Sequence, residues 1–265
     1  ENGNVLVENV EFKNLDIGIE AGGIQADGMQ EGFIVQNSDF KDVSTGIRYY
    51  SYKGYRPNNG KVDFTGNDFS EADTALQIGR NDIPAYTDFT GQKINATGNY
   101  WGVTSGSKIN TDRIESSKSN NRVAPAAIDF STYLLNGDDQ DTSKKGFQGD
   151  FSQLGVTTQG ASLDNLTTTQ GKSLPDGRIG KAVDIVQDGV KEGGDRKIEV
   201  EDGTFKEEVV VNKSVSIIGN GTANTTILDG AAPASGPDGI TVKADNVTLS
   251  GMIIENYDNG VVVNR

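Results

Sequence analysis

The sequence contains no cysteine and no histidine. Without cysteine, the chain forms no disulfide and offers no thiolate to a metal ion. Without histidine, it lacks the commonest general base and the commonest metal ligand. Basic residues are also scarce, since 24 Lys and Arg stand against 38 Asp and Glu and leave a formal net charge of −14. This balance argues against a nucleic-acid partner, because phosphate binding needs clustered Lys and Arg.

Long apolar runs are missing as well. No stretch reaches the length of a membrane span, and no signal peptide is visible, so we expect no membrane-spanning segment here. Proline is low at 6 residues, whereas glycine is high at 34. Val, Ile and Thr recur beside Asn, Asp and Gly, a combination typical of short strands joined by tight turns. The composition therefore predicts a mostly β protein.

One block of about 17 residues returns several times along the chain. It reads VTLSGMIIENYDNGVVV from Val247, VLVENVEFKNLDIGIEA from Val5, FIVQNSDFKDVSTGIRY from Phe33 and VDFTGNDFSEADTALQI from Val62. A looser copy, QKINATGNYWG, starts at Gln92. In each full copy an apolar residue is followed by Gly or Asn, then by a large apolar residue, a polar residue and a Gly or Ala. Internal repetition of this kind indicates a repeat architecture.

The interval between repeats indicates which repeat architecture the chain adopts. The aligned apolar residues Val7, Val35, Phe64 and Ile94 are 28, 29 and 30 residues apart. This interval is too short for a propeller blade and lacks the leucine-rich pattern. It fits one coil of a β-solenoid in which inward apolar residues stack from coil to coil. Asn side chains at the turns can form hydrogen-bonded ladders along such a stack.

The second half opens with a different pattern. GRIGKAVDIVQDGVKEGG places Ile179, Ala182, Val183, Ile185 and Val190 near one helical stripe that ends at the glycine pair 193–194. Next come RKIEVEDGTFKEEVVVNKSVSIIGNG and TTILDG. This region resembles the opening of pectin methylesterases and of other right-handed parallel β-helix proteins of the pectate-lyase-like superfamily. The resemblance implies an amphipathic helix that caps the first coils, and GNYWG at 98–102 resembles a motif near the end of such helices.

Compared with those families, the order of the parts is permuted. We expect residues 1–102 to form the C-terminal half of a right-handed parallel β-helix, 103–177 a long polar linker, and 178–265 the capping helix with the N-terminal half. The chain would then start and stop in mid-coil, exposing strand edges and apolar core. The residues expected to stack across such a joint are Val5, Val7, Val10, Phe12, Leu249, Met252, Ile254, Val261 and Val263.

Three arrangements would cover these ends. The chain could be one period of a tandem array, separate copies could dock head to tail, or one molecule could close on itself as a circular permutant. A docked contact between copies yields an open filament unless its rotation closes a ring.

The aromatic cluster YYSYKGY offers a possible glycan or protein contact through Tyr49, Tyr50, Tyr52 and Tyr55. Nearby Arg48 and Lys53 are the best candidates for the base of a polysaccharide lyase. A pectin methylesterase needs paired aspartates, a Gln and an Arg at set positions, and this sequence contains only separate, partial matches to that set. We therefore assign no catalytic residue.

Two further features concern ligands and modification. Asp138, Asp139 and Asp141 could bind calcium through their carboxylate oxygens, although their spacing is not that of an EF-hand. The alternative interpretation is an acidic loop exposed to solvent. No other cofactor is expected. Six Asn-x-Ser/Thr sequences could carry glycans in a secreted protein, or could simply be the turns of a solenoid. They lie at Asn95, Asn165, Asn212, Asn220, Asn224 and Asn246.

The sequence as a whole predicts a structural subunit of an extracellular filament, sheath, surface layer or adhesin stalk. Its partners would be copies of itself, with surface glycans as a further possibility. A carbohydrate-active enzyme or a glycan-binding module on the same scaffold is the alternative.

Overall fold

The computed structural model describes eleven stretches of the chain, and all structural statements below concern them. They are 5–22, 32–50, 62–79, 93–116, 127–161, 166–167, 173–174, 177–187, 196–221, 226–230 and 238–264. The chain folds into two compact units. Unit 1 comprises Glu1–Asp129 and Asn136–Gly149, and unit 2 comprises Phe130–Leu135 and Asp150–Arg265. Strands dominate both units, which confirms the all-β prediction.

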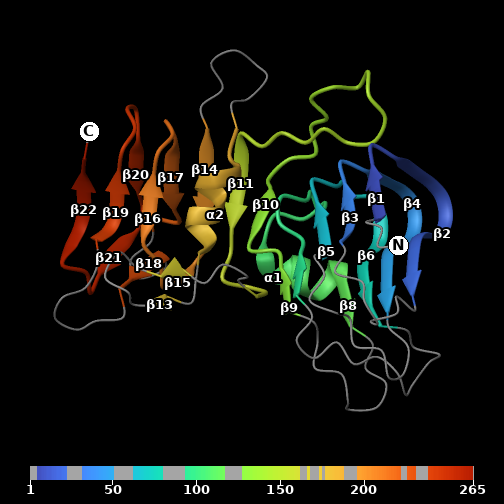
Figure 1. The fold of residues 1–265 in the computed structure, drawn as a ribbon, viewed down its shortest axis with the longest axis horizontal. Helices are drawn as coiled ribbons and strands as arrows, with labels where there is room; N and C mark the ends of the chain where they lie inside the picture. The colour runs from blue at the N-terminus through green and yellow to red at the C-terminus, as the bar shows by residue number, and fades with distance from the viewer. Residues whose placement is uncertain are drawn as a thin grey trace. The chain divides into compact units, whose positions relative to one another are not determined.

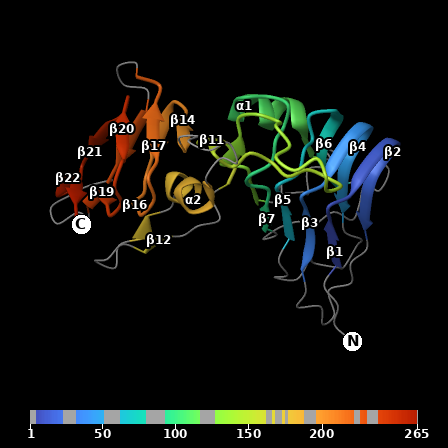
Figure 2. The same cartoon turned by 90° about the horizontal axis from the view of Figure 1, so that it is seen from above.

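Unit 1 contains two parallel sheets on different sides of the unit (Figure 2). The chain alternates between them, so each passage adds one strand to both sheets. We call one passage through all sheets of a unit a layer. The first sheet consists of β1 (Val5–Glu8), β3 (Phe33–Gln36), β5 (Val62–Thr65), β7 (Lys93–Asn95) and β9 (Ala127–Asp129). The second consists of β2 (Glu11–Gly22), β4 (Asp39–Tyr50), β6 (Ala72–Ile78) and β8 (Ile114–Ser116). The short helical segments α1 (Gly106–Lys108) and η1 (Ile109–Arg113) precede β8.

The strand register follows the sequence repeat. Val7 pairs with Val35 and Val35 pairs with Phe64, as the aligned blocks predict. Ile94 was expected to continue this column, but it pairs with Val62 instead. The left-handed turn residues Gly66 and Gly98 explain this difference, because aligning these turns makes the third layer 32 residues long.

Unit 2 contains three sheets that the chain visits in rotation (Figure 1). The first consists of β10 (Thr132–Leu134), β11 (Gln153–Val156), β14 (Lys197–Val200), β17 (Ser216–Gly219) and β20 (Thr248–Ser250). The second consists of β15 (Gly203–Phe205), β18 (Thr226–Asp229) and β21 (Ile253–Glu255). The third consists of β16 (Val209–Val211), β19 (Asp238–Val242) and β22 (Asn259–Val263). Within these sheets the described pairs are parallel except β10–β11. A separate antiparallel pair joins β12 (Leu166–Thr167) to β13 (Ser173–Leu174).

The predicted amphipathic helix is α2 (Arg178–Ile185), which packs against β10, β11, β14 and β16. Its buried face contains Ile179, Ala182 and Val183, as the stripe predicts, whereas Ile185 is only half-buried. The helix is shorter than expected, since the backbone is extended at Val186. Val190, the last residue of the expected stripe, lies outside the described residues.

The segment 103–177 does not fit the expected polar linker. Its described residues include η1 and strands β8 to β11, and part of it belongs to each unit. Ile128, Phe130, Tyr133 and Leu134 are buried. These buried residues belong to the sequence AAIDFSTYLL at 126–135. The surrounding segment is rich in Ser, Thr and Asp, so its average composition is polar and predicts a linker even though this part is largely apolar.

Two side-chain columns run through the core of unit 1. The rings of Phe12, Phe40, Phe69 and Trp101 stack at centroid separations of 4.8, 4.8 and 5.5 Å. A polar column lies beside them, in which Asn67 Oδ1 accepts the Ser38 N–H at 3.0 Å and Asn99 Oδ1 accepts the Asn67 N–H at 2.8 Å. Both asparagines are fully buried. The layers are thus held together by side chains as well as by the sheet hydrogen bonds.

Within the described stretches, no helix has the length and apolarity needed to cross a membrane.

Candidate functional site

Several strands are paired on one side only within the described part of the chain, among them β8 and β9 in unit 1 and β10, β15 and β16 in unit 2. In each unit, one layer of such strands also exposes core-facing apolar side chains. In unit 1 this is residues 5–22, where β1 pairs with β3 and β2 pairs with β4. In unit 2 it is residues 248–263, where β20, β21 and β22 pair with β17, β18 and β19. Among the described strands, none pairs with the other edge of these strands. Such an edge can accept a further strand. We call these two surfaces the first end layer and the last end layer.

Apolar side chains that should face the core are exposed on both end layers. Partners in a parallel ladder face the same side of the sheet, so their exposures can be compared directly. In the last end layer, Val263 is 63% exposed although its partner Val242 is 6% exposed. In the first end layer, Leu15 is 43% exposed although its partner Val43 is 2% exposed. These side chains continue the buried columns, but their outer side is exposed and no described strand pairs beyond them.

All nine residues predicted to stack across a joint lie in the two end layers. Val5, Val261 and Val263 are exposed. The other six are half-buried, and they are Val7, Val10, Phe12, Leu249, Met252 and Ile254. The four of them with a ladder partner one layer inward have a buried partner: Val35 for Val7, Phe40 for Phe12, Ile217 for Leu249 and Leu228 for Ile254.

The two end layers have the same turn geometry. In the first end layer, Asn9 and Asn14 adopt left-handed backbone conformations with φ of 56° and 54°. In the last end layer, Gly251 and Asn256 do so with φ of 68° and 61°. Asn and Gly are the residues that tolerate this region best. The bends therefore fall five residues apart in both layers.

The end layers also carry opposite charges at one strand position. Lys13 in β2 pairs in register with Lys41, which places two cations side by side at the first end layer. Glu255 in β21 pairs with Asp229, which places two anions side by side at the last end layer. Like charges directly opposite one another are unfavourable in a sheet. Lys41 already has the Asp39 and Glu11 carboxylates beside it, so an opposite charge stacked on the first end layer would act mainly on Lys13.

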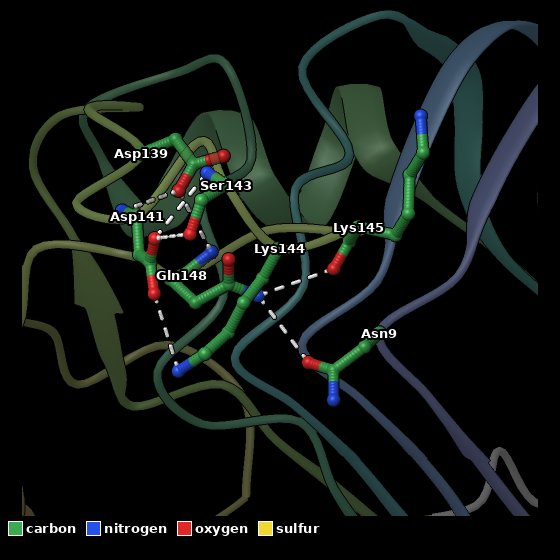
Figure 3. Close-up of polar contacts among 7 residues, drawn as sticks. All are labelled: Asn9, Asp139, Asp141, Ser143, Lys144, Lys145 and Gln148. Atoms are coloured by element: carbon green, nitrogen blue, oxygen red, sulfur yellow. Dashed lines mark hydrogen bonds and ion pairs between the residues drawn. The ribbon is translucent and has the colours of Figure 1, made fainter.

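A hairpin formed by 136–149 packs on the turns of the first two layers of unit 1 (Figure 3). The Phe147 N–H donates to the Asn37 carbonyl at 2.9 Å, and Gln148 Nε2 donates to Asn9 Oδ1 at 3.2 Å. Gly146 has φ of +80°, and a Cβ there would lie 2.1 Å from the Asn37 carbonyl oxygen. The hairpin thereby holds the Asn9 turn of the first end layer. Sequence reasoning missed it, although Gly146 beside an Asn/Asp-rich turn was the available signal.

The calcium candidates lie in this hairpin. Asp139 Oδ1 accepts the N–H groups of Asp141 and Gln148 at 3.0 and 3.3 Å, and Asp138 is exposed. The Ser143 hydroxyl and then the Lys144 ammonium hold the pKa of Asp141 below its ordinary value. These carboxylates organise the turn, and no group of three or more acidic residues in the described stretches is arranged to hold a metal.

The tyrosine cluster divides between described and undescribed residues. Tyr49 and Tyr50 are buried at 4% and 7% exposure, so the structure corrects the expectation that their rings offer a face to a glycan or a partner. The Tyr49 ring lies 6.2 Å from the rings of Phe33 and Phe64, and burial raises its pKa to about 12. Tyr52 and Tyr55 lie outside the described residues.

Arg48, the candidate lyase base, belongs to a polar column across four strands. Its guanidinium lies 3.8 Å from the Glu20 carboxylate and donates to Gln77 Oε1. Gln77 Nε2 in turn donates to Glu115 Oε2 at 2.9 Å. Because the guanidinium is held between Glu20 and Gln77, the column gives Arg48 a structural role. Lys53 lies outside the described residues.

The structure describes four of the six glycosylation candidates. Asn212, Asn220 and Asn246 are exposed, and Asn220 Nδ2 donates to Asp202 at 2.8 Å. Asn95 is half-buried and its Oδ1 accepts the Thr97 hydroxyl at 2.8 Å. Asn165 and Asn224 lie outside the described residues.

Comparison with known proteins gives no match to a family model, to a curated protein or to a solved structure.

Proposed function

We propose that this chain is a structural subunit that assembles end to end, with the last end layer of one copy stacked on the first end layer of the next. In this proposal both units are right-handed parallel β-helices, and the joint continues the helix from one copy into another. The carrying observation is that both end layers leave core-facing apolar side chains exposed. Val261 and Val263 in β22, and Val5 and Leu15 in the first end layer, are the clearest cases.

Stacking of the two end layers would stabilise the assembly in two ways. A further strand on each edge supplies hydrogen-bond partners along that edge, and its side chains remove the exposed valines and leucines from water. Exposed parallel edges of this length favour association unless something covers them. A second copy of the same chain covers both ends with the complementary surface.

The geometry of association follows from the two surfaces being different. A contact between unlike surfaces is heterologous, and repetition of such a contact yields either an open filament or a ring. Filaments, sheaths, surface layers and adhesin stalks are assemblies of this type. We place the protein outside the cell or on its surface, where glycans on exposed Asn212 and Asn246 would be compatible with the stacking of layers.

Replacement of Val263 by Asp tests this function. An unpaired carboxylate buried in the joint costs several kcal/mol, and the chain already carries net negative charge. We therefore expect V263D to weaken association more than tenfold in sedimentation velocity measurements over a range of concentrations. Each variant should be checked for the circular dichroism spectrum of the parent chain.

Val210 provides the matched control. It is 45% exposed on β16, but its side chain points away from the core, because its neighbours Val209 and Val211 are buried. V210D adds the same charge to an exposed valine outside the end layers, so it should associate like the unaltered chain. Equal association of V263D and V210D would contradict the proposal.

A further inference from the structure

The two end layers are similar enough in backbone and side chains to specify how they would stack. Resting on the proposed end-to-end function, we infer that the joint has a single register, in which Gly251 of one copy stacks on Asn9 of the next. Every paired position then differs by 242 in residue number (251 − 9). The same register places Asn256 on Asn14 and Gly260 on Gly18.

Backbone conformation is the first argument for this register. The left-handed residues are Asn9 and Asn14 in the first layer of unit 1, Asn37 and Asp42 in the second, and Gly251 and Asn256 in the last end layer. The spacing is five residues in all three layers. Within unit 1 these bends lie in register from layer to layer, because β1 pairs with β3 and β2 with β4 at an offset of 28 residues. The 242 offset brings Gly251 and Asn256 onto these bends. Asn246 is also left-handed and lies five residues before Gly251, but the offset of 237 that would stack Asn246 on Asn9 differs from 242 by an odd number of residues and turns the core-facing side chains to the other face.

Glycine contacts give a second, independent argument. A Cβ on Gly18 would lie 2.7 Å from the Gly46 carbonyl oxygen of the next layer, and a Cβ on Gly46 would lie equally close to the Ala75 carbonyl. In unit 2, a Cβ on Gly239 would lie 2.7 Å from the Gly260 carbonyl. At Gly260 itself the nearest atom is 3.7 Å away. Glycine at this open position is explained if the Gly18 carbonyl of the next copy approaches it in the same way.

The side chains that would face one another along the whole layer also favour this register. The core-facing residues Leu249, Ile254, Val261 and Val263 meet Val7, Phe12, Ile19 and Ala21. Ile254 thereby adds to the open end of the ring column that begins at Phe12. The register also places Glu255 opposite Lys13, so the anion pair Asp229–Glu255 meets the cation pair Lys13–Lys41 in one column, with opposite charges at the joint.

Registers shifted by one or two residues would be unfavourable. A shift of one residue turns every core-facing side chain to the solvent face. A shift of two residues restores the facing but stacks left-handed Gly251 and Asn256 against extended residues of β1 and β2. The register is therefore fixed by the two bends together.

Engineered disulfides test the register, because the natural chain has no cysteine to compete. In this register Ser250 lies directly opposite Glu8, at a parallel-strand separation of about 4.8 Å. That separation falls within the Cα–Cα range of a disulfide, roughly 4.4–6.8 Å. The E8C and S250C variants are made as separate chains of different mass, mixed and oxidised. We expect a disulfide-linked pair containing one chain of each kind, seen by non-reducing electrophoresis and mass spectrometry.

The matched control is E8C mixed with T248C. Thr248 is exposed and faces the same side as Ser250, but lies two residues earlier, which places its Cα about 8 Å from that of Glu8. Cross-linking of E8C with S250C at least tenfold above E8C with T248C supports the register. Assembly of the parent chain with no such preference overturns the register while leaving end-to-end stacking in place. No assembly of the parent chain at any concentration overturns both.

Discussion

Left-handed asparagines and glycines set the layer geometry at the level of single residues. Asn9, Asn14 and Asn37 adopt positive φ at low cost, because their short polar side chains tolerate this conformation. Gly66, Gly98 and Gly251 serve the same purpose in other layers. This is why the repeat could be recognised from Asn or Gly at one fixed position. The apolar residues around them vary freely in size.

The ionised carboxylate of Asp68 should lower the stability of the folded chain, and this effect can be measured. It lies between Asp39 and Tyr100 in a short parallel ladder, and its Oδ1 accepts the Ser70 N–H at 2.7 Å. Burial raises the pKa of Asp68 above its ordinary value of 3.8, and the nearby carboxylates of Asp39 and Glu71 raise it further. A carboxyl group with a raised folded-state pKa binds protons more readily in the folded chain. Its ionisation therefore lowers stability as the pH rises through that pKa.

We expect D68N to be more stable than the parent chain at neutral pH. The amide oxygen of Asn can still accept the Ser70 N–H, while the buried charge is removed. The gain should shrink as the pH falls below the pKa of Asp68, where the parent carboxyl is itself neutral. Urea unfolding at several pH values measures this difference. D73N, which alters an exposed carboxylate on β6, is the control, and an equal gain for both variants would refute the explanation.

Helix α2 shows how one element depends on a residue distant in sequence. Glu207 is fully buried, and its two carboxylate oxygens each accept one N–H from the start of the helix, Ile179 and Gly180, at 2.9 Å. Arg178 is also buried and donates to the carbonyl groups of Thr157, Gln159 and Gly160. The start of the helix is therefore fixed from two sides.

Replacement of Glu207 by Ala should destabilise unit 2 by about 2 to 5 kcal/mol, because it leaves two buried N–H groups without their charged acceptor. E207Q keeps one acceptor oxygen and should lose less. The free energy of unfolding from urea titration gives both values. E199A removes an exposed carboxylate on β14 and should change stability by less than about 1 kcal/mol. Unchanged stability of E207A would show that the cap contributes nothing.

The elements differ in how far the sequence predicts them. The strands of the repeat blocks and the buried face of α2 are predicted because their apolar residues recur at regular positions. Strands β9, β10 and β11 escape prediction, because each contains only three or four residues and lies among Ser, Asp and Gln. Their pairing, antiparallel for β10–β11 and parallel for β11–β14, depends on contacts distant in sequence.

The candidate site was predictable to a similar extent. The nine residues expected to stack lie in the two end layers, because they belong to the same repeat that defines the strands, and their stacking across a joint stays a prediction. Burial of Tyr49 and Tyr50 was not predictable, since an aromatic cluster has the same composition whether it faces the core or solvent. The hairpin on Asn9 was also missed, because its contacts join residues 139 positions apart.

At the scale of the whole molecule, each chain carries one open surface of each kind. The first end layer exposes Val5 and Leu15 beside the cations Lys13 and Lys41, and the last end layer exposes Val261 and Val263 beside the anions Asp229 and Glu255. The proposed contact joins these two unlike surfaces, and a contact between unlike surfaces can be repeated from copy to copy, whereas a contact between like surfaces closes a pair.

Electron microscopy of the purified chain in negative stain, at several concentrations, tests end-to-end assembly most directly. The account predicts filaments or rings built from many copies, increasing in number or length with concentration and lost in V263D. Particles of a single 28.2 kDa chain at every concentration would contradict it.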